Sequence, residues 1–98
     1  MIVITGSVAV KEGRLADALA LSLEHVRRSR LENGCVSHAV HHDAENPNAL
    51  FFFEEWVDQA AVDAHFAVPA SRNFVRELGA LASQPPRLSL YDATKRVR

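Results

Sequence analysis

The most constraining feature of this sequence is an aromatic strand that runs directly into a helix, between Leu50 and Phe66. Its first half contains three consecutive phenylalanines, two carboxylates and the only tryptophan of the chain, and aromatic residues favour extended backbone. Side chains alternate across a strand, so this segment should present two rows to opposite faces of a sheet. One row is Leu50, Phe52, Glu54 and Trp56, and the other is Phe51, Phe53, Glu55 and Val57. Both faces of the strand are therefore apolar, and each row contains a single carboxylate.

The helix after this strand has a clear start and one inward face. Asp58 is a suitable N-cap, because its carboxylate can accept a hydrogen bond from a free N–H group of the first turn. Val62, His65 and Phe66 follow one another at helical spacing and should share the face that packs on the sheet. This spacing predicts that His65 points into the core.

The rest of the chain is predicted to supply three more strands and further helical segments. Strands are expected over residues 2–10, 35–42 and 87–92, and a long amphipathic helix is expected over residues 14–32. Gly34 follows that helix and can take the left-handed conformation that often ends one. Pro69 should interrupt the helix that begins at Asp58, and Ser71 is expected to cap a further helical segment.

The resulting order, βαββαβ, is that of a ferredoxin-like α+β domain with both helical segments on one face of a four-stranded sheet. Residues 1–98 are too few for more than one such domain. The first and third strands carry apolar residues on both faces, so the face without helices would expose a large apolar patch. The sequence therefore predicts a homodimer in which two sheets pack face to face, a dimeric α+β barrel.

Charge and composition argue against several classes of partner. A formal charge of −1 and a pI near 6.5 provide no general attraction to nucleic acid or to an anionic membrane. The first ten residues lack the basic and apolar pattern of an export signal, which favours a cytoplasmic location. Cys35 is the only cysteine and is expected to be a small buried apolar residue. The RNA-recognition module shares the βαββαβ order, but the chain lacks its Lys/Arg-Gly-aromatic motif.

Four short segments stand out by their order and spacing, which span essentially the whole chain: Asn33-Gly34-Cys35, Asn46-Pro47-Asn48, Glu54 with Trp56, and Ala64-His65. Together they resemble the antibiotic biosynthesis monooxygenase family of dimeric α+β barrels. The resemblance implies a homodimer with a small-molecule pocket, and oxygenation of an aromatic or quinol-like substrate by O2 without metal, flavin or haem. The same fold also hosts isomerases, haem-degrading enzymes and inactive members.

Haem degradation is not favoured by the residues present. The haem-degrading branch of the family uses an Asn on the first strand together with a Trp and a His on the helix after the third strand. Here the first strand, Ile2 to Val10, has no Asn, His65 stands where the Trp is expected, and Val75 stands about ten residues later.

The predicted site combines a base with an aromatic wall. A cofactor-free oxygenase must remove a proton from its substrate to leave an electron-rich anion, and imidazole is the side chain best suited to accept a proton near neutral pH. We therefore predict His65 as the base and Glu54 as the carboxylate that orients it. The substrate pocket is expected to be lined by Trp56, Phe52, Phe66, Val62 and His38.

Two other interpretations of these residues remain open. Each predicted site residue also has a purely structural role available to it, in core or dimer packing, and the chain could be a small-molecule binder or an isomerase without oxygenase activity. The histidines of the second strand suggest a metal site less strongly. His41 and His42 are adjacent and should point to opposite faces, so together with His38 they are not expected to converge on one ion.

Overall fold

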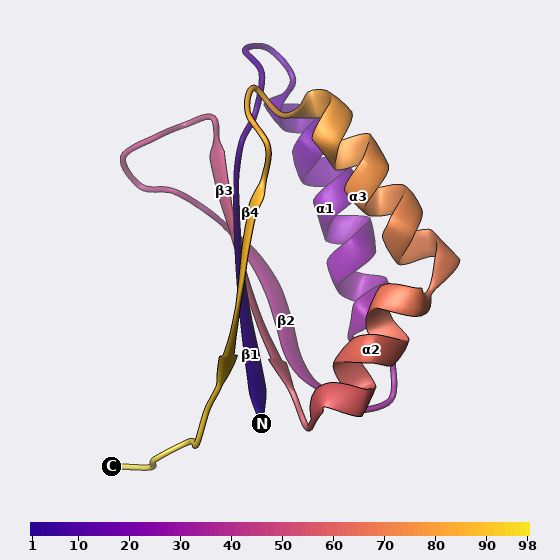
Figure 1. Cartoon of the computed structure of the whole chain (residues 1–98). Helices are drawn as coiled ribbons and strands as arrows, with labels where there is room; N and C mark the ends of the chain where they lie inside the picture. Colours follow the sequence, from indigo (N-terminus) through magenta and orange to yellow (C-terminus); the bar gives the residue numbers. More distant parts are fainter.

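The computed structural model describes residues 1–98 and places all the helices on one face of an antiparallel sheet (Figure 1). The strands are β1 (Ile2–Ala9), β2 (Cys35–His42), β3 (Ala49–Trp56) and β4 (Arg87–Asp92), and the helices are α1 (Leu15–Ser29), α2 (Gln59–Ala67) and α3 (Pro69–Leu81). The sheet order is β2-β3-β1-β4, with every neighbouring pair antiparallel. This confirms the predicted ferredoxin-like α+β fold.

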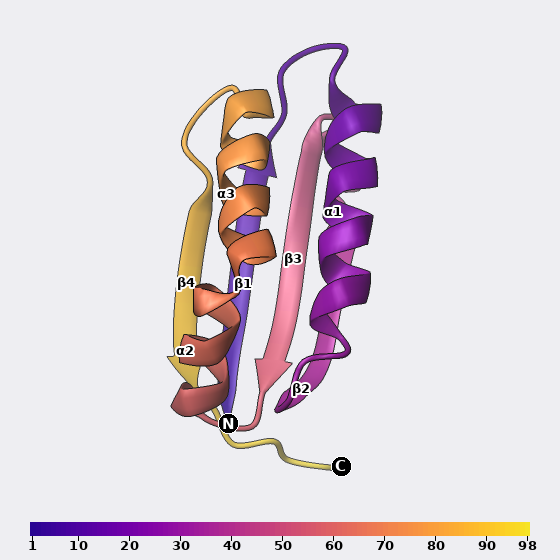
Figure 2. The ribbon, with the colours of Figure 1, turned by 90° about the vertical axis from the view of Figure 1, so that its right-hand side faces the viewer.

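The helical layer has two columns (Figure 2). One is α1, which lies over the β2 side of the sheet, and the other is α2 followed by α3, which lies over the β1 and β4 side. The two columns pack against each other and close over the inner face of the sheet. No helix is long and apolar enough to cross a bilayer.

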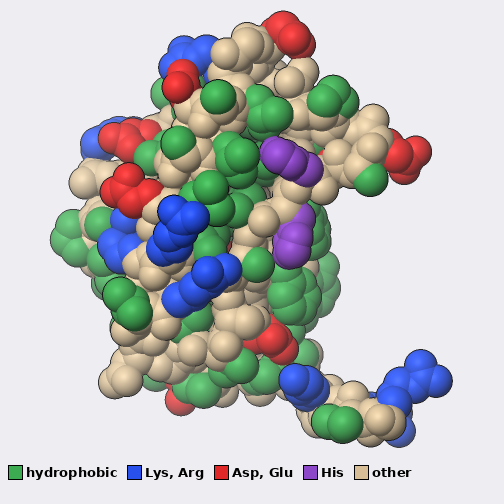
Figure 3. All heavy atoms as spheres, turned by 180° about the vertical axis from the view of Figure 1, so that it is seen from behind, with side chains coloured by type: hydrophobic (Ala, Val, Ile, Leu, Met, Phe, Trp, Pro, Cys, Tyr) green, Lys and Arg blue, Asp and Glu red, His purple; other side chains and the backbone are tan.

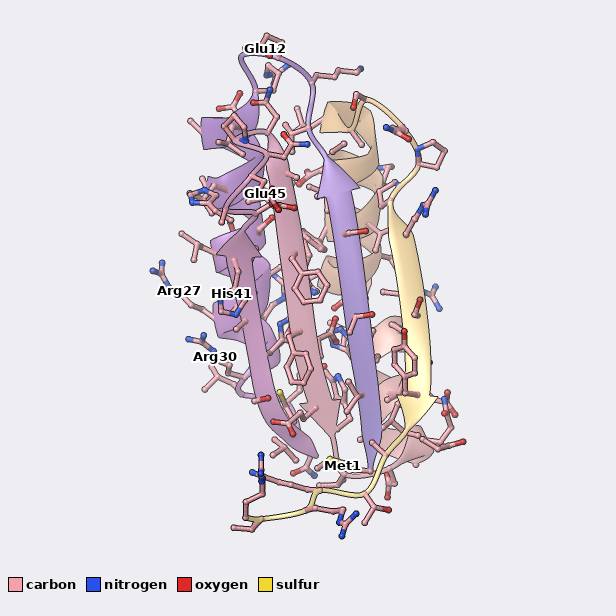
Figure 4. All side chains as sticks on the ribbon, turned by 90° about the vertical axis from the view of Figure 1, so that its left-hand side faces the viewer. Met1, Glu12, Arg27, Arg30, His41 and Glu45 are labelled. Atoms are coloured by element: carbon pink, nitrogen blue, oxygen red, sulfur yellow. The ribbon has the colours of Figure 1, made fainter.

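The two rows of β3 face the sides that the alternation predicts. Leu50, Phe52, Glu54 and Trp56 are all buried beneath the helices. In the opposite row, Phe51 and Phe53 remain 41% and 37% exposed. Figure 4 looks onto this second face, where no helix covers the strands. Figure 3 shows hydrophobic side chains gathered beside the projecting β2–β3 hairpin.

The starts of the two short helices follow different rules. The carboxylate of Asp58 accepts a 2.9 Å hydrogen bond from the backbone N–H group of Ala61, which confirms it as the N-cap of α2. The prediction that Ser71 caps α3 is wrong, because that helix begins at Pro69 and Ser71 is buried inside it. Proline suits the first turn of a helix, since its missing N–H group would have no partner there.

The corner between α1 and β2 packs tightly against α2. Gly34 has φ +83°, and a Cβ atom added to it would lie 2.5 Å from Cβ of Ala61 and 2.9 Å from a methyl group of Val57. The backbone N–H group of Val57 also donates a 2.9 Å hydrogen bond to the carbonyl oxygen of Gly34. Both the conformation and the space therefore require glycine at this position.

β2 contains one irregularity, immediately after this corner. Cys35 pairs with Trp56 and Ser37 pairs with Glu55, so Val36 is an extra residue on the β2 strand. Such a bulge lets two residues of one strand oppose one residue of its partner. Beyond it the pairing is regular, and His38 lies beside Glu54 on the inner face.

Candidate functional site

Three histidines from three different elements meet between the sheet and the helices. His25 comes from α1, His38 from β2 and His65 from α2, and all three are buried. Their ring centres lie 5.3 Å apart for His25 and His38, 5.4 Å for His25 and His65, and 5.7 Å for His38 and His65. We call these three residues the imidazole cluster. Trp56 borders it, with its ring centre 4.5 Å from that of His65.

His65 is inward-facing, as its helical spacing predicts, and it is held by a carboxylate from the α1–β2 corner. Its Nδ1 atom lies 2.8 Å from Oε1 of Glu32, whereas its Nε2 atom lies 3.9 Å from Oε1 of Glu54. An ionised carboxylate only accepts hydrogen bonds, so Nδ1 is the nitrogen that donates to Glu32, and in the neutral ring Nε2 keeps its lone pair. Glu32, rather than the predicted Glu54, therefore orients this ring.

Glu54 is a buried carboxylate with two nitrogen neighbours on one oxygen atom. The indole N–H group of Trp56 donates a 2.9 Å hydrogen bond to Oε1, and Nε2 of His38 lies 3.2 Å from the same atom. Burial alone raises the pKa of this carboxyl, but His38, the Trp56 N–H group and His65 together hold it below its ordinary value. Glu54 therefore places a negative charge beside the cluster at neutral pH.

His25 is neutral because of its surroundings. Burial, followed by the neighbouring His38, His65 and Arg28, lowers the pKa of His25 to about 3. Its ring stacks on Phe74 with the centres 3.9 Å apart and the planes 5° from parallel. An arginine only donates, so the 2.9 Å contact with Nη2 of Arg28 requires Nδ1 of His25 to accept. The proton of the His25 ring therefore lies on Nε2.

A cleft between α1 and α3 reaches His25 from the surface. It encloses about 200 Å³ and is lined by Leu21, Glu24, His25, Arg28, Ala70, Asn73, Phe74 and Glu77. An engineered cavity of about 150 Å³ can hold benzene, so a single aromatic ring fits this volume. His25 and Phe74, whose rings stack on each other, both line the cleft, and His25 also belongs to the imidazole cluster.

The predicted pocket residues are divided between the core and the surface. Trp56, Val62, Phe52 and His38 are buried around or beside the imidazole cluster, and none of them lines the α1–α3 cleft. The prediction that Phe66 shares the inward face of its helix is wrong, because Phe66 is 40% exposed. The α2 helix has only nine residues and buries a narrow stripe formed by Val62 and His65.

Three residues of the site were not predicted from the sequence. His25 falls on the buried stripe of α1, three residues after Ser22, and that spacing could have identified it. Glu32 and Arg28 offered no such signal, because one lies in an irregular corner and the other on the margin of its helix.

The prediction that His41 and His42 do not converge with His38 agrees with the structure, because both are exposed and pair with outward and inward residues of β3 respectively. His41 lies on the open side of β2 (Figure 4). A group of histidines from different elements was not predicted. The imidazole cluster comes from three elements that are distant in sequence, and one ligand atom from each histidine of the cluster lies within 4.8 Å of the others.

Cys35 is half-buried rather than fully buried, and it packs against the small apolar cluster that contains Trp56 and Val62. Burial, and then the charges of Glu54 and Glu32, raise the pKa of its thiol. A thiol with a raised pKa is a poor nucleophile at neutral pH, which agrees with the predicted packing role.

Solved structures with the same fold are numerous, and several match over nearly the whole chain. An antibiotic biosynthesis monooxygenase of known crystal structure is 28% identical, with a TM-score of 0.89, over 97% of this chain and 100% of that chain. A candidate antibiotic biosynthesis monooxygenase from Deinococcus radiodurans is 21% identical, with a TM-score of 0.94, over 100% and 97% of the two chains. The protein Rv0793 from Mycobacterium tuberculosis is 20% identical, with a TM-score of 0.90, over 99% and 98%. The last two likenesses concern the fold alone.

Sequence comparisons point in the same direction. An uncharacterized protein of Synechocystis sp. is 34% identical over 90 residues, which is 92% of this chain but only 61% of the length of that relative. The model of the antibiotic biosynthesis monooxygenase family matches residues 1–77 of the chain, and these residues include the whole imidazole cluster. The chain therefore belongs to the antibiotic biosynthesis monooxygenase family.

Proposed function

We propose that this chain is a cofactor-independent monooxygenase that acts on a small aromatic or quinol-type substrate. His65 removes a proton from the substrate, and the resulting anion reduces O2 directly. Oxidation of a phenol to a quinone, or of a hydroquinone to a hydroxyquinone, removes four electrons from the substrate, so one oxygen atom enters the product and the other leaves as water. That balance needs no external reductant.

The observation that carries this proposal is the pair formed by His65 and Glu32. The 2.8 Å contact at Nδ1 fixes the ring orientation and leaves the Nε2 lone pair free beside the indole of Trp56. A carboxylate that holds one nitrogen of a buried imidazole is a recurring way to prepare the other nitrogen as a general base. Positioned bases contribute about 10²- to 10⁴-fold to a rate.

The proposal assigns substrate entry to the α1–α3 cleft. The cleft shares a wall residue, His25, with the imidazole cluster. An aromatic substrate can lie against the stacked rings of His25 and Phe74, and displacement of the His25 ring would bring it to His65. Trp56, predicted as a pocket residue, then forms the far wall, and Glu54 lies beside it.

The proposal also includes a homodimer. Phe51 and Phe53 stand on a sheet face that no helix covers, and Tyr91 of β4 is 52% exposed. A contiguous apolar face of this kind is uncommon on a monomer and typical of an interface.

Oxygen uptake by wild-type protein and two His65 variants tests the reaction. With a series of hydroquinones of one to three rings, and after chelator treatment, wild type should consume O2 faster than the uncatalysed rate. His65→Ala and His65→Gln should each lose about 10²-fold or more, because glutamine keeps a donor for Glu32 but has no basicity. His41→Ala, which changes an exposed histidine, should keep full activity. Full activity in His65→Gln would contradict the assigned base.

An isomerase or simple binder in the same fold is the second candidate. The pair of His65 and Glu32 suits proton transfer between two carbons equally well, without O2. Wild-type protein that binds these compounds, or exchanges their activated protons with deuterium from solvent, without oxygen uptake would favour this candidate over the oxygenase.

A further inference from the structure

The imidazole cluster is larger than a single general base requires. His65 with Glu32 would suffice for proton removal, yet His25 and His38 are also buried against it. Burying a polar group without a partner costs free energy, and Nδ1 of His38 is buried with no partner in the structure. The spacing of the three rings suggests what its partner is.

The rings stand close to the arrangement of a tetrahedral metal site. With metal–nitrogen bonds of about 2.0–2.1 Å, three histidine ligands bring their nitrogens to about 3.4 Å and their ring centres to about 5 Å from one another. The ring centres here are 5.3, 5.4 and 5.7 Å apart, and the ligand atoms lie within 4.8 Å of one another. The ring spacing is therefore close to that of a metal site, and rotation of the rings is the movement that would bring the three nitrogens around one ion.

The hydrogen bonding leaves lone pairs for such an ion. Nε2 of His38 lies 3.2 Å from Oε1 of Glu54 and donates to that carboxylate, so Nδ1, which has no partner, is the nitrogen of this ring that keeps a lone pair. His65 uses Nδ1 for Glu32 and leaves Nε2 free. A carboxylate on the outer nitrogen of a ligating histidine is the usual support of a protein metal site. The carboxylates of Glu54, which is buried, and Glu32, which is half-buried, also supply negative charge to offset a divalent cation.

Arg28 opposes metal binding in the arrangement described here. Its donation to Nδ1 of His25 places the ring proton on Nε2, so Arg28 must turn away before His25 can offer Nε2 to a metal. Nε of Arg28 is buried without a partner, and the adjoining cleft presents the carboxylates of Glu24 and Glu77. The side chain therefore has alternative partners within the cleft.

We propose that His25, His38 and His65 form a binding site for one divalent transition-metal ion of the zinc and copper class. Imidazole ligands suit these ions, and a site with three protein ligands leaves a fourth position for water or another small ligand. The metal takes the Nε2 lone pair of His65, so the loaded protein has no free base. Metal binding and the proton removal proposed above are mutually exclusive.

Direct binding measurements test this site without reference to activity. Tag-free protein is stripped with a chelator and titrated with ZnCl2 or CuSO4 by calorimetry, and with CoCl2 while the visible absorption is recorded. One ion per chain and the intense absorption of tetrahedral cobalt are expected. His25→Phe, which preserves the stacking on Phe74, and His38→Ala and His65→Gln should each lose this binding. Circular dichroism confirms that the variants are folded.

Matched variants separate this site from adventitious binding. His41→Ala and His42→Ala remove exposed histidines and should bind as wild type does. Arg28→Gln should bind more tightly, because the glutamine carbonyl can accept a hydrogen bond from Nδ1–H of a metal-bound His25. Glu32→Gln should weaken binding by about 10- to 100-fold, the usual effect of losing a carboxylate behind a ligating histidine.

Three outcomes would overturn the assignment. They are the absence of stoichiometric binding in wild type, loss of binding in the His41 or His42 variant, and retention of full affinity in all three cluster variants. Oxygen uptake judges the proposed function separately. Activity in the stripped protein that falls on adding Zn2+ fits both proposals, whereas activity only in the loaded protein keeps the metal site and contradicts His65 as the base.

Discussion

His25 is the residue whose protonation the fold opposes most strongly. Its pKa of about 3, against 6.5 for a free histidine, means that the folded chain holds this ring neutral where the unfolded chain would protonate it. Its contribution to stability is therefore complete above about pH 6.5 and is lost as the pH falls toward 3. His38 and His65 face it from β2 and α2, and Arg28 faces it from α1.

This linkage predicts a specific sensitivity to acid. Between pH 7 and pH 5, with chelator present, protonation of unfolded His25 should cost the native state roughly 2 kcal/mol. In His25→Phe that part of the loss should be absent, and the phenyl ring can still stack on Phe74. Urea unfolding at the two pH values measures the difference. His41→Phe is the control, and it should lose stability on acidification as wild type does; equal losses in wild type and His25→Phe would contradict the prediction.

For single residues, the sequence predicted which side chains point into the core better than it predicted their hydrogen-bond partners. Helical spacing from Val62 placed His65 inward, and strand alternation placed Glu54 and Trp56 with it. The partner of His65 was mistaken, because Glu32 approaches through a corner whose path no periodicity describes. His25 was overlooked because its stripe on α1 was identified from its apolar members.

At the scale of elements, the α1–β2 corner is the joint that fixes α2 relative to the sheet. Gly34 touches Ala61 of α2 and accepts a hydrogen bond from Val57 at the end of β3. The same corner carries Glu32, so its position determines where the partner of His65 stands.

Gly34→Ala should therefore be strongly destabilising. A left-handed conformation costs an alanine about 1–2 kcal/mol, and the overlap with Cβ of Ala61 adds a repacking cost of about 1–3 kcal/mol. Gly13→Ala is a matched control, because Gly13 has φ +79° but open space around its missing Cβ, and it should show the conformational cost alone. Chemical denaturation of both variants gives the comparison; equal losses would show that contact with α2 is unimportant.

Helix boundaries were predictable from the sequence where a capping side chain marks them. Asp58 caps α2 as expected, because a carboxylate just before a helix can accept a hydrogen bond from a free N–H group of the first turn. The start of α3 was mistaken at Ser71, because Pro69 itself can begin a helix and a serine two residues later is then simply buried. The α1 helix ends at Ser29, ahead of the expected Glu32, and the residues between form the corner.

For the whole molecule, the sheet has one face covered by helices and one face open (Figure 1). We expected a partner subunit because the aromatic residues make both faces of β3 apolar. Phe51 and Phe53 are exposed on the open face of the sheet, where such a partner would pack. The fold could be predicted from the order of helices and strands along the chain, because the rules for connecting a βαββαβ sequence of elements allow few compact arrangements.

Phe53→Asp should convert a dimer to a folded monomer. The side chain is 37% exposed in the single chain, so a carboxylate there is tolerated by one subunit but would be buried between two facing sheets. Light scattering coupled to gel filtration measures the mass, and circular dichroism checks the fold. Leu31→Asp, at an 89% exposed position of the α1–β2 corner, is the control and should stay dimeric. A monomeric wild type would contradict the interface.

The bulge gives β2 one residue, Val36, that has no pairing partner on β3. The position of this extra residue determines where the strand can lose a residue without changing its pairing. Removing Val36 would leave Cys35 and Ser37 opposite consecutive residues of β3, as in a regular ladder, with His38 still beside Glu54. Removing a residue beyond the bulge, such as Ala39, would turn every later side chain of the strand to the opposite face. Deletion of Val36 should therefore be tolerated and deletion of Ala39 should be disruptive, although the two positions lie only three residues apart.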